Sequence, residues 1–267
     1  MHPRVSVSAI SSFRLRFDDC LALWQQHGVT NVGLAFRQMD DKLAEAARTR
    51  DAGLTVSSVL LPGRPLTDRS GWAERRDLLL LGFEVARITD AATVAIVTGS
   101  AGPLSWEAAA DAFAELVAPV LAQLPADHPP LVVEHTHALR ADIGFLHTLR
   151  DAVELAERLG IGALMEVNAC WAERDLATTV ERGVTNGTIG LVQVSDYVIG
   201  TTTTPDRAVP GDGDLPLARL LGQLEAAGYA GWYEIEIVGP RIEHEGYDAA
   251  IPRAVAATSA LLDTSVR

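Results

Sequence analysis

The sequence predicts a (β/α)8 TIM barrel, an α/β fold in which eight parallel strands alternate with eight helices. Short runs rich in β-branched residues alternate eight times with longer runs rich in Ala, Leu, Glu and Arg. The length agrees, because 267 residues shared among eight units gives about 33 residues each. The loop after the first strand, at residues 11–13, has no glycine, which disfavours an open nucleotide-binding sheet.

The expected elements follow one another along the whole chain. The β-branched runs predict strands at residues 5–10, 31–35, 55–60, 93–97, 131–134, 163–167, 190–194 and 232–238. The runs between them predict helices at residues 18–27, 41–52, 72–89, 106–123, 144–159, 174–182, 216–227 and 247–262. No linker or low-complexity stretch divides them, so we expect a single domain over residues 1–267.

The chain is strongly acidic, with 22 Lys and Arg against 35 Asp and Glu and a formal charge of −13. Lys42 is the only lysine and the arginines are spread out, so the basic stripe of a nucleic-acid binder is missing. Two cysteines, Cys20 and Cys170, are too few for a disulfide scaffold, and the chain begins without a signal-peptide pattern. The apolar runs are too short for a membrane span. We therefore expect a cytoplasmic protein with a small-molecule partner, and leave a homo-oligomer open.

Polar side chains gather where the last four expected strands end, which in this fold is where the active site lies. They are Glu134, His135 and His137 at the fifth strand, Glu166 and Asn168 at the sixth, Gln193, Ser195 and Asp196 at the seventh, and Glu234 and Glu236 at the eighth. The second and third strands are followed instead by Arg37 and Arg64. We expect this half of the barrel mouth to carry the chemistry.

The alternation of side chains in the eighth strand sharpens this prediction, because successive side chains point to opposite faces. Tyr233, Ile235 and Ile237 share a face that suits the surrounding helices. Glu234 and Glu236 then point into the barrel. Glu234 lies deeper along the strand, so we expect it to lie inside the barrel or to pair with an arginine.

Several carboxylates that converge inside a barrel repel one another, and one divalent cation resolves the conflict. Carboxylate and amide oxygens suit Mn²⁺ or Mg²⁺ better than zinc. The expected metal ligands are Glu134, Glu166, Gln193 and Glu236. Glu134 and Glu236 are also the candidates for general base and general acid. Either nearby histidine is placed to relay a proton, and we assign His137 to catalysis and His135, with Asn168, to the substrate.

Two segments extend the pattern. Residues 228–236 read G-Y-A-G-W-Y-E-I-E, and residues 207–214 read R-A-V-P-G-D-G-D. Together with the polar residues at the strand ends, these two segments resemble the xylose isomerase-like TIM barrels, the sugar phosphate isomerase/epimerase family. That family has a G-Y-x-G segment with a Glu five residues later, and an R-x-x-P-G-x-G-x loop. The resemblance implies that Arg207 reaches the substrate, and we expect Arg64 to help hold an anionic or hydroxyl-rich end of it.

Three positions depart from the family pattern. Glu166 stands where the family has Asp, Ala169 where it has a following His, and Gln193 where it has His. A Glu/Asp/Gln/Glu set is found in some dehydroshikimate-dehydratase members, so Gln193 is compatible with a metal site. The longer Glu166 and the amide at Gln193 shift the expected chemistry away from simple ketose epimerisation.

The sequence and the resemblance together predict a divalent-metal-dependent isomerase, epimerase or lyase. Its substrate is expected to be a sugar, keto-sugar or polyhydroxy cyclic ketone that loses a proton next to a metal-polarised carbonyl. A dehydroshikimate-dehydratase-like lyase is one alternative. Another, motivated by the missing histidine, is a non-catalytic barrel that serves as a partner subunit or ligand-binding module. A metal-dependent phosphodiesterase is disfavoured by the few histidines and the acid excess.

Overall fold

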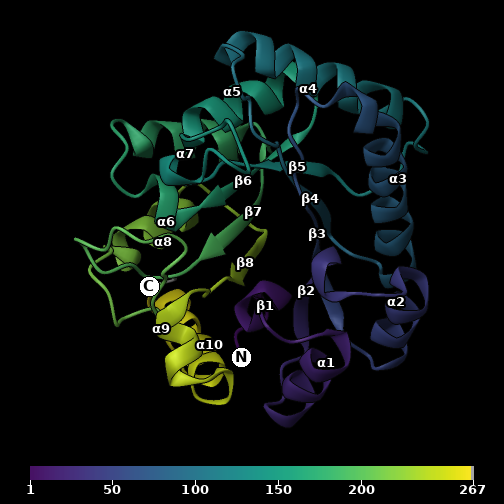
Figure 1. The fold of residues 1–267 in the computed structure, drawn as a ribbon. Helices are drawn as coiled ribbons and strands as arrows, with labels where there is room; N and C mark the ends of the chain where they lie inside the picture. Colours follow the sequence, from purple (N-terminus) through teal and green to yellow (C-terminus); the bar gives the residue numbers. More distant parts are fainter. Residues whose placement is uncertain (266–267) are drawn as a thin grey trace.

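Within residues 1–265, the part of the chain that the computed structural model describes, eight parallel strands close into a barrel. Neighbouring strands follow the sequence order, and the last strand pairs with the first to close the ring. The helices surround this ring on the outside, and the chain runs once around it from purple to yellow (Figure 1). The predicted (β/α)8 barrel is confirmed.

The strands lie close to the predicted ranges. They are β1 (Val5–Ser8), β2 (Asn31–Ala35), β3 (Thr55–Leu61), β4 (Thr93–Val97), β5 (Leu131–Glu134), β6 (Gly162–Glu166), β7 (Ile189–Val194) and β8 (Trp232–Ile235). The predictions for β1 and β8 are too long. The hydroxyl of Ser8 accepts the N–H of Ile10 and starts a 3-10 turn, which ends β1 early. After β8, Glu236 still donates its N–H to the carbonyl of Val194 as the chain leaves the sheet.

The helices cover the barrel in chain order. They are α1 (Phe17–Gln26), α2 (Lys42–Asp51), α3 (Trp72–Thr89), α4 (Trp106–Leu121), α5 (Leu149–Leu159), α6 (Val167–Cys170), α7 (Leu176–Thr185), α8 (Leu217–Ala226), α9 (Pro240–Glu245) and α10 (Tyr247–Ser265), with 3-10 turns η1 (Ala9–Ser12), η2 (Phe36–Gln38), η3 (Arg69–Gly71) and η4 (Ala138–Arg140). Helix α5 begins later than predicted because Thr148 caps it, accepting the N–H of Asp151 at 3.0 Å. The short helices α6 and α9 were not predicted. No helix among residues 1–265 is long and apolar enough to cross a lipid bilayer.

The barrel interior is built in layers by the alternation of side chains along the strands. One apolar cluster inside the barrel consists of Ala95, Val132, Leu164 and Leu191, with Leu60 and Trp232 packed against it. Glu234 follows Trp232 by two residues along β8, and Glu236 follows two residues later in the chain. On the outer face, Tyr233, Ile235 and Ile237 are buried in the core beneath the helices, as predicted. The polar residues of β8 therefore follow, along the strand, the residue that packs against this apolar cluster.

Glu234 is fully buried, and the neighbouring strands are shaped around it. Its Oε2 atom accepts hydrogen bonds from Ser57 Oγ at 2.7 Å and Ser58 Oγ at 2.6 Å. A register shift between β2 and β3 lets these consecutive serines reach the same carboxylate. Gly33 leaves the remaining space, because a Cβ atom there would lie 2.2 Å from Glu234 Oε2. Glu234 therefore lies inside the barrel, held by hydroxyl groups, and pairs with no arginine among residues 1–265.

Candidate active site

A cavity of about 550 Å³ opens at the carboxyl ends of the strands. Its two sides differ in chemistry. The side formed by the first four strands and their loops is mainly apolar, with Ile10, Phe13, Ala35, Leu60, Leu61, Pro62 and Val97. The opposite side carries Glu134, Thr136, His137, Glu166, Asn168, Arg207 and Glu236. Of the polar residues that the sequence placed at the ends of the last strands, five therefore lie around one cavity: Glu134, His137, Glu166, Asn168 and Glu236.

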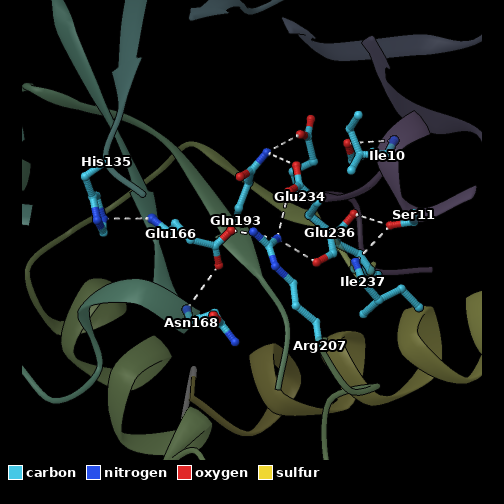
Figure 2. A network of polar contacts seen from close by, with 12 residues as sticks. Ile10, Ser11, His135, Glu166, Asn168, Gln193, Arg207, Glu234, Glu236 and Ile237 are labelled. Carbon is cyan, nitrogen blue, oxygen red and sulfur yellow. Dashed lines mark hydrogen bonds and ion pairs between the residues drawn. The ribbon is translucent and has the colours of Figure 1, made fainter. Parts of the chain in front are cut away.

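Three buried carboxylates and one arginine form the centre of the polar side, and we call Glu134, Glu166, Glu236 and Arg207 the acidic centre. Arg207 Nη1 lies 2.7 Å from Glu166 Oε2 and 2.7 Å from Glu236 Oε1. It also donates to the backbone carbonyl of Glu236 at 2.9 Å. Figure 2 shows the guanidinium between the two carboxylates. A single nitrogen atom thus joins side chains from β6 and from the segment after β8.

Arg207 reaches this position from the long loop between β7 and α8, which Asp196 holds in shape. The buried carboxylate of Asp196 accepts backbone N–H groups from Tyr197 at 2.8 Å, Gly211 at 2.9 Å and Leu215 at 3.0 Å. The backbone N–H of Arg207 itself donates to Val238 at 3.0 Å. The backbone around Arg207 is therefore fixed, while its side chain ends in the cavity.

The burial of the carboxylates changes their proton affinity. Burial raises the pKa of Glu166 to about 7, although the nearby guanidinium of Arg207 works against this rise. Burial also raises the pKa of Glu134, and the carboxylates of Glu236 and Glu166 raise it further. One arginine is too little positive charge for three carboxylates, so burial and mutual repulsion favour proton uptake by Glu134 and Glu166 unless another cation enters.

Gln193 completes the centre from β7. Its Nε2 atom donates to Glu236 Oε2 at 2.6 Å and to Glu234 Oε1 at 3.2 Å. Its Oε1 atom is buried and has no hydrogen-bond partner among the described residues. A buried amide oxygen without a partner is costly unless something binds it.

The side chains present fit a hard divalent cation by their chemistry. Three carboxylates and the unpartnered amide oxygen of Gln193 offer only oxygen atoms, the ligands that Mn²⁺ and Mg²⁺ prefer. Within residues 1–265, no three His, Cys, Asp or Glu side chains stand close enough together to hold a metal ion in this arrangement. Arg207 lies between two of the carboxylates instead. The donors are thus present, and Arg207 takes the place where two of them converge.

His137 and Asn168, the residues expected to serve catalysis and substrate binding, both line the cavity. His137 is half-buried, and burial together with His147 and Arg207 lowers its pKa. The Nδ2 atom of Asn168 is buried without a hydrogen-bond partner among the described residues. Both side chains are therefore available to a bound molecule.

Two predicted substrate contacts are corrected by the structure. His135 is fully buried behind the sheet, where its Nε2 atom accepts the backbone N–H of Glu166 at 3.1 Å (Figure 2). Burial lowers its pKa to about 3, so it is a neutral support for β6. Arg64 does not line the cavity, and its guanidinium pairs with Glu74 at 2.8 Å on an exposed surface.

Two other arginines line the cavity, Arg37, to which the sequence analysis gave no role, and Arg140, which it did not consider. Arg37 lies over the ring of Phe13, 3.6 Å from its centroid, and donates to the Phe13 carbonyl at 2.6 Å. Arg140 pairs with Asp142 at 2.9 Å. Arg37 directly follows the second strand, which indicated a place at the barrel mouth. The turn that brings Arg140 to the cavity has no comparable pattern in the sequence.

Neither cysteine is expected to react with iodoacetamide in the folded protein. Burial raises the pKa of Cys20 to about 11 and raises that of Cys170 well above its ordinary value, so the reactive thiolate is scarce. Mass spectrometry after native labelling should find both unmodified, and labelling in denaturant should modify both. Rapid native modification of Cys170 would show that its surroundings are not those described.

Together, the fold and the acidic centre define a (β/α)8 barrel with its polar site at the carboxyl ends of the last four strands. The chain belongs to the xylose isomerase-like TIM barrel family, whose family model matches residues 17–257. None of the curated proteins matches its sequence. The resemblance inferred from the strand ends and the two loop segments is confirmed.

Solved structures share the fold over nearly the whole chain. Protein SMc04130 from Sinorhizobium meliloti 1021 is 23% identical, with a TM-score of 0.83 and 98% of each chain covered. The IOLI protein with a bound zinc atom is 15% identical, with a TM-score of 0.76 over 98% of this chain and 99% of that one. An L-ribulose 3-epimerase is 18% identical, with a TM-score of 0.72 over 100% of this chain and 96% of that one. At these identities the likeness concerns the fold.

Proposed function

We propose that the protein is a divalent-metal-dependent isomerase, epimerase or lyase that acts on a sugar, a keto-sugar or a polyhydroxy cyclic ketone. The observation that carries the proposal is the set of three buried carboxylates beside an unpartnered amide oxygen at the mouth of a xylose isomerase-like barrel. The similar structures of an L-ribulose 3-epimerase and of the zinc-containing IOLI protein support both the reaction class and the metal.

Glu134, Glu166, Glu236 and the Oε1 atom of Gln193 would hold the cation, with Mn²⁺ or Mg²⁺ favoured by the all-oxygen donor set. When bound, the cation polarises a carbonyl and the adjacent hydroxyl group, which acidifies the C–H bond beside the carbonyl.

The side chains of this barrel then supply the proton transfers. Glu134 from β5 and Glu236 after β8 reach the cavity from different strands, so one is placed to remove a proton and the other to deliver one. The half-buried His137 is placed to relay protons between the cavity and solvent. The Nδ2 atom of Asn168 offers a hydrogen bond to a substrate hydroxyl or carbonyl group. Arg37 takes the anion-binding role first assigned to Arg64, because Arg37 lines the cavity.

A lyase of the dehydroshikimate-dehydratase kind is the second candidate. Gln193 favours it, because its amide matches the third position of the Glu/Asp/Gln/Glu set of those enzymes. The apolar wall of the cavity is also suited to one face of a carbocyclic ring, whereas an open-chain sugar has little apolar surface to place there.

Proton exchange in D₂O tests the proposed chemistry whatever product the protein forms. The Mn²⁺-loaded protein is incubated with ketoses and polyhydroxy cyclic ketones, and NMR follows deuterium entering the carbon beside the carbonyl. Exchange that EDTA abolishes is expected for an isomerase or epimerase, and loss of water to a conjugated enone for a lyase. Neither outcome on any compound, with no shift in thermal unfolding at saturating Mn²⁺, would favour a non-catalytic barrel.

The affinity for Mn²⁺ is expected to rise with pH between about pH 6 and about pH 8, because the ligands must lose their protons before they bind the cation. Burial holds the pKa of Glu166 at about 7 and raises that of Glu134, so protons compete with the cation below neutral pH. Calorimetry in two buffers of different ionisation enthalpy should detect proton release on binding. An affinity that stays constant over this range would contradict the assignment of these ligands.

A further inference from the structure

We infer that Arg207 and the divalent cation are alternative occupants of the acidic centre, so that binding of the cation drives the Arg207 side chain away from Glu166 and Glu236 into the cavity. The inference rests on the proposed function, because it concerns the same metal ligands. Until the metal binds, the positively charged guanidinium of Arg207 holds the carboxylates of Glu166 and Glu236 together.

The geometry makes the two occupants exclusive. One atom, Arg207 Nη1, lies 2.7 Å from an oxygen of Glu166 and 2.7 Å from an oxygen of Glu236. A divalent cation bound by the same two oxygens would lie about 2.0–2.2 Å from each of them, in the space that the nitrogen fills. Two positive charges at that distance would also repel each other strongly in a buried site.

The two carboxylates are oriented toward Arg207 by neighbouring N–H groups. Glu166 Oε1 accepts the backbone N–H of Asn168 at 3.1 Å, and Glu236 Oε2 accepts Nε2 of Gln193 at 2.6 Å (Figure 2). Each carboxylate therefore has one oxygen held by a neighbour and the other directed at the guanidinium. These hydrogen bonds orient two of the carboxylates toward one cation. The remaining ligands must still move closer to hold a divalent ion, because no three acidic or histidine side chains among residues 1–265 stand close enough together in this arrangement.

The length of the Glu166 side chain explains why this chain can form the contact with Arg207. Glu166 stands where the family has Asp, and the additional methylene group carries its carboxylate further from β6 toward Arg207. The side chains of Glu166 and Glu236 are only 2% and 6% exposed, and that of Arg207 is 13% exposed. Buried charges of this kind stay paired unless another cation replaces the partner.

The cavity provides a place for Arg207 after it is displaced. Arg207 already lines the cavity, and hydrogen bonds at its backbone hold the loop independently of the guanidinium. Once released, the guanidinium is free to bind a carboxylate or phosphate group of a substrate. Such a substrate would in turn strengthen cation binding, because coupling between two ligands is reciprocal.

Calorimetric titration of the metal-free protein with Mn²⁺ tests the inference. The variant Arg207→Gln is expected to bind Mn²⁺ about tenfold more tightly than the unaltered protein, or more, because the competing cation is gone. The matched control Arg37→Gln removes another cavity arginine that contacts a backbone carbonyl and no carboxylate among the described residues. This control measures the effect of losing one positive charge near the site. It is expected to change the affinity for Mn²⁺ by less than about threefold.

Arg207→Lys gives a second test that keeps every charge and every metal ligand, and it decides the matter if Arg207→Gln fails to fold. The lysine side chain is shorter, which draws the positive charge back from both carboxylates, so Mn²⁺ should bind more tightly than to the unaltered protein. The gain should be smaller than that of Arg207→Gln, because a weaker competitor remains.

The outcomes separate the inference from the proposed function. If the unaltered protein binds Mn²⁺ and Arg207→Gln binds it no more tightly than Arg37→Gln, the inference is overturned and the metal site stands. Unchanged or weaker binding of Mn²⁺ by Arg207→Lys also overturns the inference and leaves the metal site standing. If neither the unaltered protein nor any variant binds Mn²⁺, the metal site is overturned, and the inference with it.

Discussion

Replacement of Glu236 by Gln is expected to lower kcat/KM by about a thousandfold or more and to weaken Mn²⁺ binding. Glu236 has three roles in the proposed site, as metal ligand, as proton donor or acceptor, and as a partner of Arg207. The amide has nearly the same shape but can neither carry the negative charge nor exchange the proton. Steady-state kinetics on the substrate found by proton exchange, with metal analysis of the same sample, measures both effects.

Glu74→Gln is the matched control for this change. Glu74 pairs with Arg64 on an exposed surface, so its replacement removes one carboxylate without touching the acidic centre. It should leave kcat/KM and metal content unchanged. Full metal content together with full activity in Glu236→Gln would show that the segment after β8 does not carry the chemistry.

The second large effect is on stability. Replacement of Gly33 by Ala is expected to lower the free energy of unfolding by about 2–4 kcal/mol. The new Cβ atom would lie 2.2 Å from Glu234 Oε2 and 2.8 Å from Ser58 Oγ. Glu234 has no free space to move into, because it is fully buried and held by hydroxyl groups. Urea unfolding followed by circular dichroism measures the difference.

Gly222→Ala is the matched control. Gly222 lies within α8, and a Cβ atom there would meet nothing within 4 Å. Alanine in a helix is more stable than glycine by about 0.5–1 kcal/mol, so this variant should be as stable as the unaltered protein or more stable. Equal stability of Gly33→Ala and the unaltered protein would mean that Glu234 does not occupy the position described.

Much of the fold was predictable because each strand–helix unit repeats the same change of composition. The limits of the elements were less predictable, because long-range contacts decide them. Strand β8 ends at Ile235 while the apolar pattern continues to Val238, since the following segment turns toward the loop that carries Arg207. The short helix α6 depends on the side chain of Glu166 accepting the N–H of Asn168, a contact that composition does not reveal.

The polar site was predictable where the alternation of side chains applies. That rule correctly directed Glu234 and Glu236 into the barrel. It also explains the correction at His135, whose neighbour Glu134 faces the cavity and leaves the histidine on the opposite side. The ion pairs of Arg207 could not be predicted, because its position depends on how Asp196 folds a long loop.

A crystal structure of the protein with Mn²⁺, with the ion located by anomalous scattering, tests the proposed metal site most directly. We predict one strong anomalous peak within bonding distance of Glu134, Glu166, Glu236 and the Oε1 atom of Gln193, with Arg207 displaced into the cavity. No peak at that position under saturating Mn²⁺, with Arg207 still between Glu166 and Glu236, would contradict the metal-dependent function proposed for this barrel.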